Sequence, residues 1–165
     1  MRYRTLGRTG AVVSEVGFGG AGAGLQSYIR RWDPTREDHV EEVVGAIRRA
    51  VELGVTYFDT APRYGSEEMF GRALKPHRSK IFLATKVRAA TEDTVRQSVE
   101  ESLARLQTDY VDLIQYHGDC YTRAELERFF VPDGILAGLQ AVRREGMARF
   151  IGFTAEAAEI AEKNR

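Results

Sequence analysis

The sequence has few of the residues that mark several classes of protein. It contains one cysteine, Cys120, and three scattered histidines, so we expect neither a disulfide framework nor a metal site. Lys and Arg balance Asp and Glu at 24 each, whereas a nucleic-acid-binding domain normally carries a basic excess. No apolar run approaches the roughly 20 residues of a membrane span, and residues 1–10 show no signal-peptide core. These absences predict a cytoplasmic protein without nucleic-acid or membrane partners.

The remaining composition is that of an ordinary globular protein. Hydrophobic residues make up 43% of the 165 positions and charged residues 29%. No internal repeat, low-complexity tract or linker divides the chain. We therefore expect residues 1–165 to form a single domain.

Expected strands and helices alternate along the chain. Residues 3–15 resemble a hairpin that turns at Gly7–Gly10. The strands that follow are expected at residues 16–18, 55–59, 80–85, 110–116 and 148–153. Helices are expected at residues 35–53, 66–74, 91–106, 132–145 and from 156, with a helical turn within 123–129. Thr35 with Asp38 resembles a capping box, and Ser66 suits an N-cap. This alternation predicts an α/β fold with parallel strands.

The number of strand–helix units leaves two architectures open. A complete (β/α)₈ barrel takes about 250 residues for its eight units. This sequence supplies five such units. It therefore predicts either an open five-stranded sheet or the first part of a barrel, and the length alone does not choose between them.

The stretch Gly17–Gly22 matches the pattern G-x-G-x-x-G of dinucleotide-binding loops. The surrounding sequence does not fit that use, because a helix should open at the third glycine and the next expected helix starts only at Thr35, after Asp33-Pro34. Two other interpretations remain. The glycines either permit a close backbone approach or leave room for a flat ring near the strand end.

Polar side chains follow three successive expected strands. Asp59, Lys86 and His117 each stand at the end of a strand, and Tyr64 lies on the loop after Asp59. The carboxyl ends of parallel strands are where α/β folds bind ligands, and neighbouring strands lie about 5 Å apart. We therefore expect Asp59, Lys86 and His117 to converge on one pocket, with Tyr64 over it.

These four residue types form a coherent proton-transfer set. A free tyrosine has a pKa near 10, and a nearby lysine ammonium favours the tyrosinate. A carboxylate would orient the lysine, and a neutral histidine can bind a carbonyl oxygen. Singly, each residue has an ordinary structural interpretation, such as a turn cap, a solvated lysine or a buried histidine. Trp32 and Tyr28 either wall a pocket or pack their loop down.

Taken together, the motifs resemble those of the aldo/keto reductase family. The segment Phe58–Glu67 resembles the family's most specific motif, and Ala84–Val87 and Gln115–His117 resemble its lysine and histidine motifs. Residues 3–10 and 13–19 resemble its N-terminal hairpin and first strand, and Arg149–Thr154 resembles its fifth strand.

The resemblance implies a fold and an activity. The fold would be an N-terminal hairpin plus a partial (β/α)₈ TIM barrel of about five parallel strands. The activity would be the reduction of a small-molecule carbonyl substrate, an aldehyde or ketone, with NADPH or less often NADH. Tyr64 would be the general acid and Lys86 would depress its pKa. Asp59 would pair with Lys86, and His117 would orient the carbonyl.

The resemblance also implies where the cofactor would lie. Gly20 and Ala21 after the first strand, Asp59, and Thr154 after the fifth would be near the nicotinamide. The family's last three strands and the loops that hold the adenine have no counterpart in this sequence. Three explanations are open: a fragment, a half-barrel completed by self-association through its open edges, and a degenerate relative with another role.

Two alternatives to a reductase follow. One is a non-catalytic interaction module that has the family's motifs without the cofactor clamp. The other is a flavodoxin-like sheet with strand order 2-1-3-4-5. A sequential strand order would favour the partial barrel instead.

Overall fold

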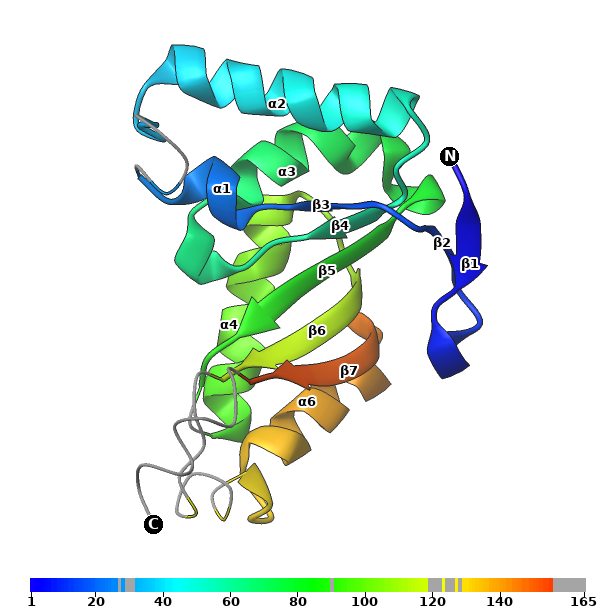
Figure 1. Ribbon diagram of the computed structural model, residues 1–165. Coiled ribbons are helices and arrows are strands. Elements are labelled where there is room, and N and C mark those ends of the chain that lie inside the picture. Colours follow the sequence, from blue (N-terminus) through cyan, green and yellow to red (C-terminus); the bar gives the residue numbers. More distant parts are fainter. Residues whose placement is uncertain are drawn as a thin grey trace.

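The computed structural model describes residues 1–26, 28, 32–89, 91–118, 123, 127 and 129–155, and its strands form two sheets (Figure 1). A two-stranded antiparallel hairpin pairs β1 (Tyr3–Thr5) with β2 (Val12–Ser14). The second sheet has five parallel strands, which are β3 (Gly17–Gly19), β4 (Tyr57–Asp59), β5 (Phe82–Val87), β6 (Val111–His117) and β7 (Ala148–Thr154). Their order is β3-β4-β5-β6-β7, which confirms the partial barrel and excludes the flavodoxin-like order.

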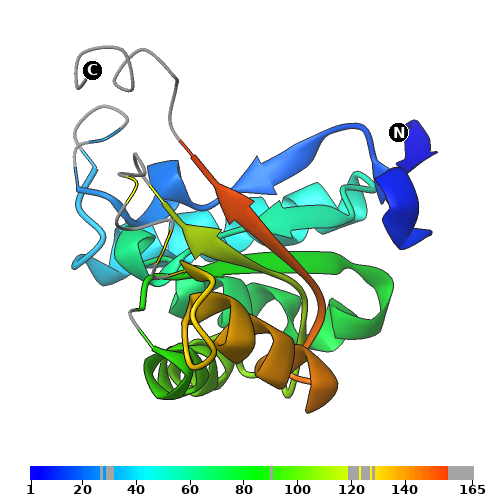
Figure 2. The same ribbon diagram turned by 90° about the horizontal axis from the view of Figure 1, so that it is seen from below.

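Helices cover one face of this sheet, as Figures 1 and 2 show. They are α1 (Ala21–Gly24), α2 (Glu37–Glu52), α3 (Glu67–Leu74), α4 (Glu92–Leu106) and α6 (Ile135–Arg144). In the part of the chain that the structure describes, the 3-10 helices are η1 (Gly7–Thr9), η2 (Pro62–Tyr64) and η3 (Lys75–Lys80). Within the described ranges, none of the helices combines the length and apolar character that crossing a bilayer requires.

Within the described residues the predicted order of strands and longer helices is confirmed, but the short helix α1 opens at Ala21, where the sequence predicted only a glycine-rich loop, and the helix starts differ. The expected capping box of Thr35 with Asp38 is wrong, because α2 begins at Glu37 and Thr35 instead donates its N–H and hydroxyl to Asp33 at 2.9 and 2.7 Å. Such a local side-chain turn competes with a cap. Ser66 occupies the N-cap position of α3, yet its hydroxyl is hydrogen-bonded to that of Thr60.

The last expected helices either begin later than predicted or lie outside the described residues. α6 begins at Ile135, so Pro132 precedes the helix instead of opening it. Cys120, most of the turn expected at 123–129, and the helix expected from residue 156 lie outside the described residues.

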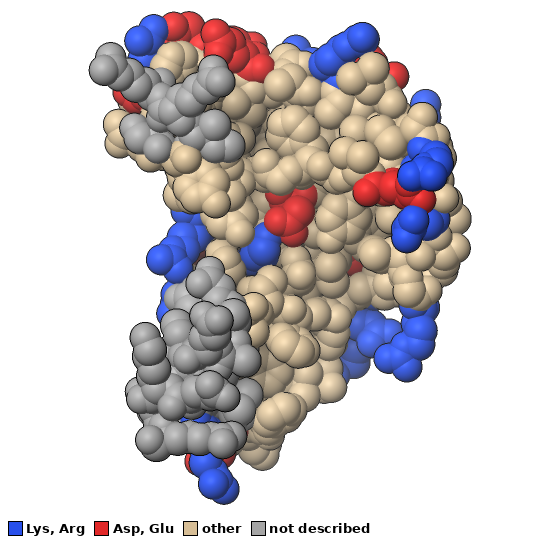
Figure 3. Space-filling model, viewed as in Figure 1, with Lys and Arg blue, Asp and Glu red and all other residues tan. Residues whose placement is uncertain are grey.

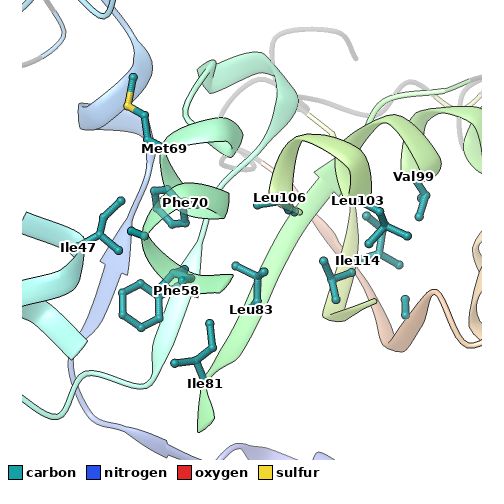
Figure 4. Packing of buried hydrophobic residues seen from close by; sticks show 14 of the residues in the cluster. Ile47, Phe58, Met69, Phe70, Ile81, Leu83, Val99, Leu103, Leu106 and Ile114 are labelled. Carbon is teal, nitrogen blue, oxygen red and sulfur yellow. The ribbon is translucent and has the colours of Figure 1, made fainter. Parts of the chain in front are cut away.

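The core lies between the sheet and its helices. Side chains on one face of α2, including Val43, Val44 and Ile47, are buried as their three- and four-residue spacing predicts. Figure 4 shows Ile47, Phe58 and Phe70 packed together, with Leu83 and Ile114 continuing the layer along the next strands. This packing fixes which face of each strand points away from the helices.

The opposite face of the sheet carries an aromatic row. Tyr57 stacks on Phe82 at a centroid distance of 5.3 Å, and Phe82 stacks on Phe150 at 6.2 Å. The face shown in Figure 3 is mostly uncharged, with an acidic and a basic group close together near its middle. The aromatic row lies on the same face of the sheet as the polar side chains at the strand ends.

A buried carboxylate joins the strands at their other ends. Asp112 is 1% exposed and accepts the Leu83 N–H at 2.9 Å. It pairs with Arg78 at 2.8 Å and with Arg149 at 2.6 Å. The network links η3, β5, β6 and β7 and helps to hold them in register.

The different burial of two phenylalanines predicts that their replacement by alanine lowers the free energy of unfolding by very different amounts. Phe58 is fully buried, whereas Phe130 is 69% exposed. Phe58→Ala should lower the free energy of unfolding by about 3–5 kcal/mol, because it leaves a cavity among packed rings. Phe130→Ala should cost less than about 1 kcal/mol. Urea unfolding measures both, and equal losses would contradict the described core.

Candidate active site

The register of the parallel strands brings the predicted polar residues to one edge of the sheet. Asp59 lies opposite Ala84, Lys86 opposite Gln115, and His117 opposite Thr154. Because side chains alternate along a strand, these positions share the face that carries the aromatic row. The convergence of Asp59, Lys86 and His117 expected from the sequence is present.

The Lys86 ammonium is buried at this edge and has two polar partners. Its side chain is only 5% exposed, pairs with Asp59 Oδ1 and donates to the carbonyl oxygen of Thr60 at 2.9 Å. Gln115 Nε2 donates to the other carboxylate oxygen of Asp59 at 3.2 Å. A buried ammonium needs such partners, since an unpaired charge in the interior is very costly. Asp59 therefore provides the counter-charge for the Lys86 ammonium and fixes its position.

Tyr64 reaches the same place from the loop after β4. It is the last residue of η2, and the next residue, Gly65, caps this helix with a positive φ of 74°. Lys86 Nζ lies 4.9 Å from the centroid of the Tyr64 ring. The His117 ring meets that ring edge-to-face at 5.6 Å and 84°. The structure thus brings all four predicted residues together.

The residues expected near a nicotinamide line the same edge. The Gly20 N–H donates to the Asp59 carbonyl oxygen at 2.7 Å, and Ala21 starts α1 directly after it. The Thr154 hydroxyl donates to the carbonyl oxygens of Tyr116 and Gly118 at 3.5 and 3.4 Å. Proximity of these residues to a cofactor stays a prediction.

The glycines after β3 divide into two kinds. A Cβ on Gly19, which pairs with Asp59, would meet nothing within 4 Å. A Cβ on Gly20 would come within 2.5 Å of Ser66 Oγ and 2.8 Å of Thr60 Oγ1. Gly19 therefore leaves open space beside Asp59, whereas Gly20 permits close packing of the protein against itself.

Tyr57, the other tyrosine on this face, is in a different electrostatic situation. Burial raises the pKa of Tyr57, and the negative charge of Asp59 raises it further. Tyr57 is therefore a weaker acid than a free tyrosine, and its ring belongs to the aromatic floor.

Sequence reasoning missed one polar residue of the site, Gln115, and one buried polar residue on the helix-covered face behind it, Glu67. Gln115 stands two residues before His117 on the same strand face, a spacing that was visible in the sequence. Glu67 is 1% exposed, accepts the Thr85 hydroxyl at 2.6 Å and pairs with Arg105 at 2.7 Å. Glu67 follows the Tyr64 loop in the sequence, but nothing there showed its distant partner.

The two aromatic residues of the first long loop behave differently. Trp32 Nε1 donates to the Ala23 carbonyl oxygen at 2.7 Å, and its ring stacks on His39 at 4.8 Å. Trp32 therefore packs its loop down, which is the second of the two expected roles. Tyr28 is 63% exposed. Among the residues that the structure describes, no three His, Cys, Asp or Glu side chains cluster as metal ligands would.

A partial parallel β/α barrel with polar groups at the carboxyl ends of its strands has the layout of the barrel enzymes. A model of the aldo/keto reductase family matches residues 15–164. The chain therefore belongs to the aldo/keto reductase family.

Curated relatives agree with this assignment. L-galactose dehydrogenase of Arabidopsis thaliana is 37% identical over 166 residues, covering 93% of this chain and 48% of the relative. Methylglyoxal reductase DkgA of Salmonella typhimurium is 35% identical over 120 residues, covering 68% of this chain and 40% of the relative. The chain thus spans about half the length of the curated relatives it matches.

Solved structures show the same relationship. Aldo-keto reductase AKR11C1 of Bacillus halodurans, in its holo form, superposes with a TM-score of 0.74 at 30% identity, covering 99% of this chain and 53% of that one. An aldo/keto reductase of Klebsiella pneumoniae in complex with NADP and acetate gives a TM-score of 0.72 at 26% identity, covering 91% and 48%.

The buried ion pair predicts non-additive effects on stability. Asp59→Asn should lower the free energy of unfolding by about 3 kcal/mol, because it leaves the Lys86 ammonium buried without its counter-charge. Adding Lys86→Met to that variant should restore much of the loss, because the uncompensated charge is then removed. Urea unfolding of the two single variants and the double variant measures the coupling, and simple additivity would argue against the pair.

Proposed function

We propose that this chain forms the catalytic part of a carbonyl reductase that uses a nicotinamide cofactor, NADPH or less often NADH. The observation that carries the proposal is the position of Lys86, which contacts the Asp59 carboxylate and the face of the Tyr64 ring beside His117. Membership of the aldo/keto reductase family supports it.

Each side chain has a role in a proton transfer to a carbonyl oxygen. The bound nicotinamide would supply the hydride that reaches the carbonyl carbon. Tyr64 donates its phenolic proton to the carbonyl oxygen, and Lys86 stabilises the tyrosinate that remains. Asp59 keeps Lys86 charged and in place. His117 donates a hydrogen bond that orients the carbonyl and stabilises its developing negative charge.

The open strand end fits a flat ring. The space beside Gly19 is unfilled, the small residues Gly20 and Ala21 follow it, and Asp59 pairs with Gly19 on the next strand. At the other end of the row of strand ends, Thr154 on β7 is the register partner of His117 on β6. These features support the placement of a nicotinamide at Gly20, Ala21, Asp59 and Thr154. The NADP complex of the Klebsiella pneumoniae relative supports the choice of cofactor.

The substrate class is a small aldehyde, ketone or sugar, or the corresponding alcohol in the reverse direction. One relative's name refers to a sugar and another's to a small carbonyl compound. The aromatic row of Tyr57, Phe82 and Phe150 offers an apolar floor below the polar residues.

Replacement of one hydroxyl tests the proposed acid. Tyr64→Phe should abolish NADPH-dependent reduction of an aldehyde such as methylglyoxal, because the proton donor is lost while the ring stays packed against His117. Tyr28→Phe is the matched control, since Tyr28 is 63% exposed, and it should keep full activity. Consumption of NADPH is followed by absorbance. Unchanged turnover in Tyr64→Phe would refute the assignment, and a wild-type chain without turnover would favour the non-catalytic module.

The open sheet supports self-association as a second property. Among the described residues, β3 and β7 each pair with one strand of the sheet, so each is an edge strand. Phe153 on β7 is 68% exposed and Val16 beside β3 is 57% exposed. Pairing of such edges between chains would cover both side chains.

Light scattering during gel filtration tests this association. The wild-type mass should rise with concentration above 18.5 kDa. Phe153→Lys should shift the protein towards the monomer, because a charge at an edge disfavours pairing. A monomeric wild type at every concentration would refute self-association, and it would leave the reductase proposal standing.

A further inference from the structure

We propose that Gly24 is a positioning residue that sets the place of Tyr64. This inference rests on the proposed role of Tyr64 as the proton donor. α1, which ends at Gly24, lies directly against η2, and the contact is made by the backbone of the Tyr64 loop. Only a residue without a Cβ permits that approach.

The contact leaves no room for any side chain at this position. A Cβ on Gly24 would overlap the Tyr64 carbonyl oxygen and lie 2.7 Å from Tyr64 C and from Ser66 N. Real Cβ atoms essentially never come within 3.0 Å of such neighbours. All three atoms are backbone, so no change of rotamer relieves the overlap. An alanine at Gly24 must therefore displace α1 or the Tyr64 loop.

α1 has partners on the side away from the Tyr64 loop, and these oppose its movement away from that loop. The Ala23 carbonyl oxygen accepts the Trp32 indole N–H at 2.7 Å, and the Trp32 ring stacks on His39 of α2. At the start of α1, the Gly20 N–H is bonded to the Asp59 carbonyl oxygen. These contacts fix α1 between α2 and the end of β4. A displaced Tyr64 would lose its place over Lys86 and beside His117.

Gly24 has a matched control within the same chain. Gly45 lies in the middle of α2, is exposed, and a Cβ there would meet nothing within 4 Å. Both glycines are helical, and alanine is the better helix former at such positions. Gly45→Ala therefore reports the intrinsic effect of the substitution, and Gly24→Ala adds the contact with the Tyr64 backbone.

The test measures the position of Tyr64 separately from turnover. The protein is labelled with ¹³C-tyrosine, and the ring signal of Tyr64 is the one missing from Tyr64→Phe. Gly24→Ala should move this signal and lower kcat by about 100-fold, the size of effect that a displacement of about 1 Å produces, with KM changed little. Gly45→Ala should leave the signal and kcat unchanged.

The outcomes separate this inference from the proposed function. A folded Gly24→Ala protein whose Tyr64 signal is unmoved overturns the inference, whatever its activity. A moved signal supports it as a statement about position, even if Tyr64→Phe retains turnover and the proposed acid is thereby refuted. If Gly24→Ala does not fold, Trp32→Phe removes the bond that holds α1 without adding atoms. Its Tyr64 signal should move or broaden, and an unmoved signal there overturns the inference.

Discussion

The buried ammonium of Lys86 is the constraint on which the candidate site depends. A charge that is 5% exposed must be neutralised and hydrogen-bonded, and the structure meets this need with Asp59 from the neighbouring strand and the Thr60 carbonyl oxygen. Gln115 from the strand on the other side binds the same carboxylate. Three adjacent strands are thus tied together at their carboxyl ends. The Tyr64 ring lies over this ammonium, and the His117 ring packs against the Tyr64 ring.

Small residues allow the surrounding loops to come close enough. A Cβ at Gly20 or Gly24 would clash with Thr60, the Tyr64 backbone or Ser66, so glycine at both positions lets α1 pack against them. Gly19 is different, since its missing side chain leaves unfilled space beside Asp59. One glycine-rich stretch therefore does two things: it lets α1 pack against the Tyr64 loop, and it leaves a strand end open. The sequence left close backbone approach and open space at the strand end as alternatives, and the structure shows each of them at a different glycine.

Much of this arrangement followed from the sequence. The alternation of strands and helices predicted the element order, and polar residues at successive strand ends predicted the meeting of Asp59, Lys86 and His117. Other features depend on tertiary contacts that local patterns do not encode. Thr35 does not cap a helix, because its hydroxyl donates to Asp33 in a local turn. The Ser66 hydroxyl is hydrogen-bonded to the Thr60 hydroxyl and not to the backbone of its own helix. The burial of Glu67 depends on Arg105, a residue 38 positions away in the chain. The catalytic roles themselves stay proposals.

The most direct measurement of the central claim is a titration of the purified chain with NADPH, followed by the fluorescence of Trp32, the single tryptophan. The Trp32 indole is hydrogen-bonded to α1, which follows the strand end where we propose that the nicotinamide lies. The account predicts saturable quenching in the micromolar range, reduced by substitution of Asp59 or Thr154. No saturable change up to millimolar NADPH would contradict it, and would mean that the site formed by Asp59, Tyr64, Lys86 and His117 does not bind the cofactor its chemistry needs.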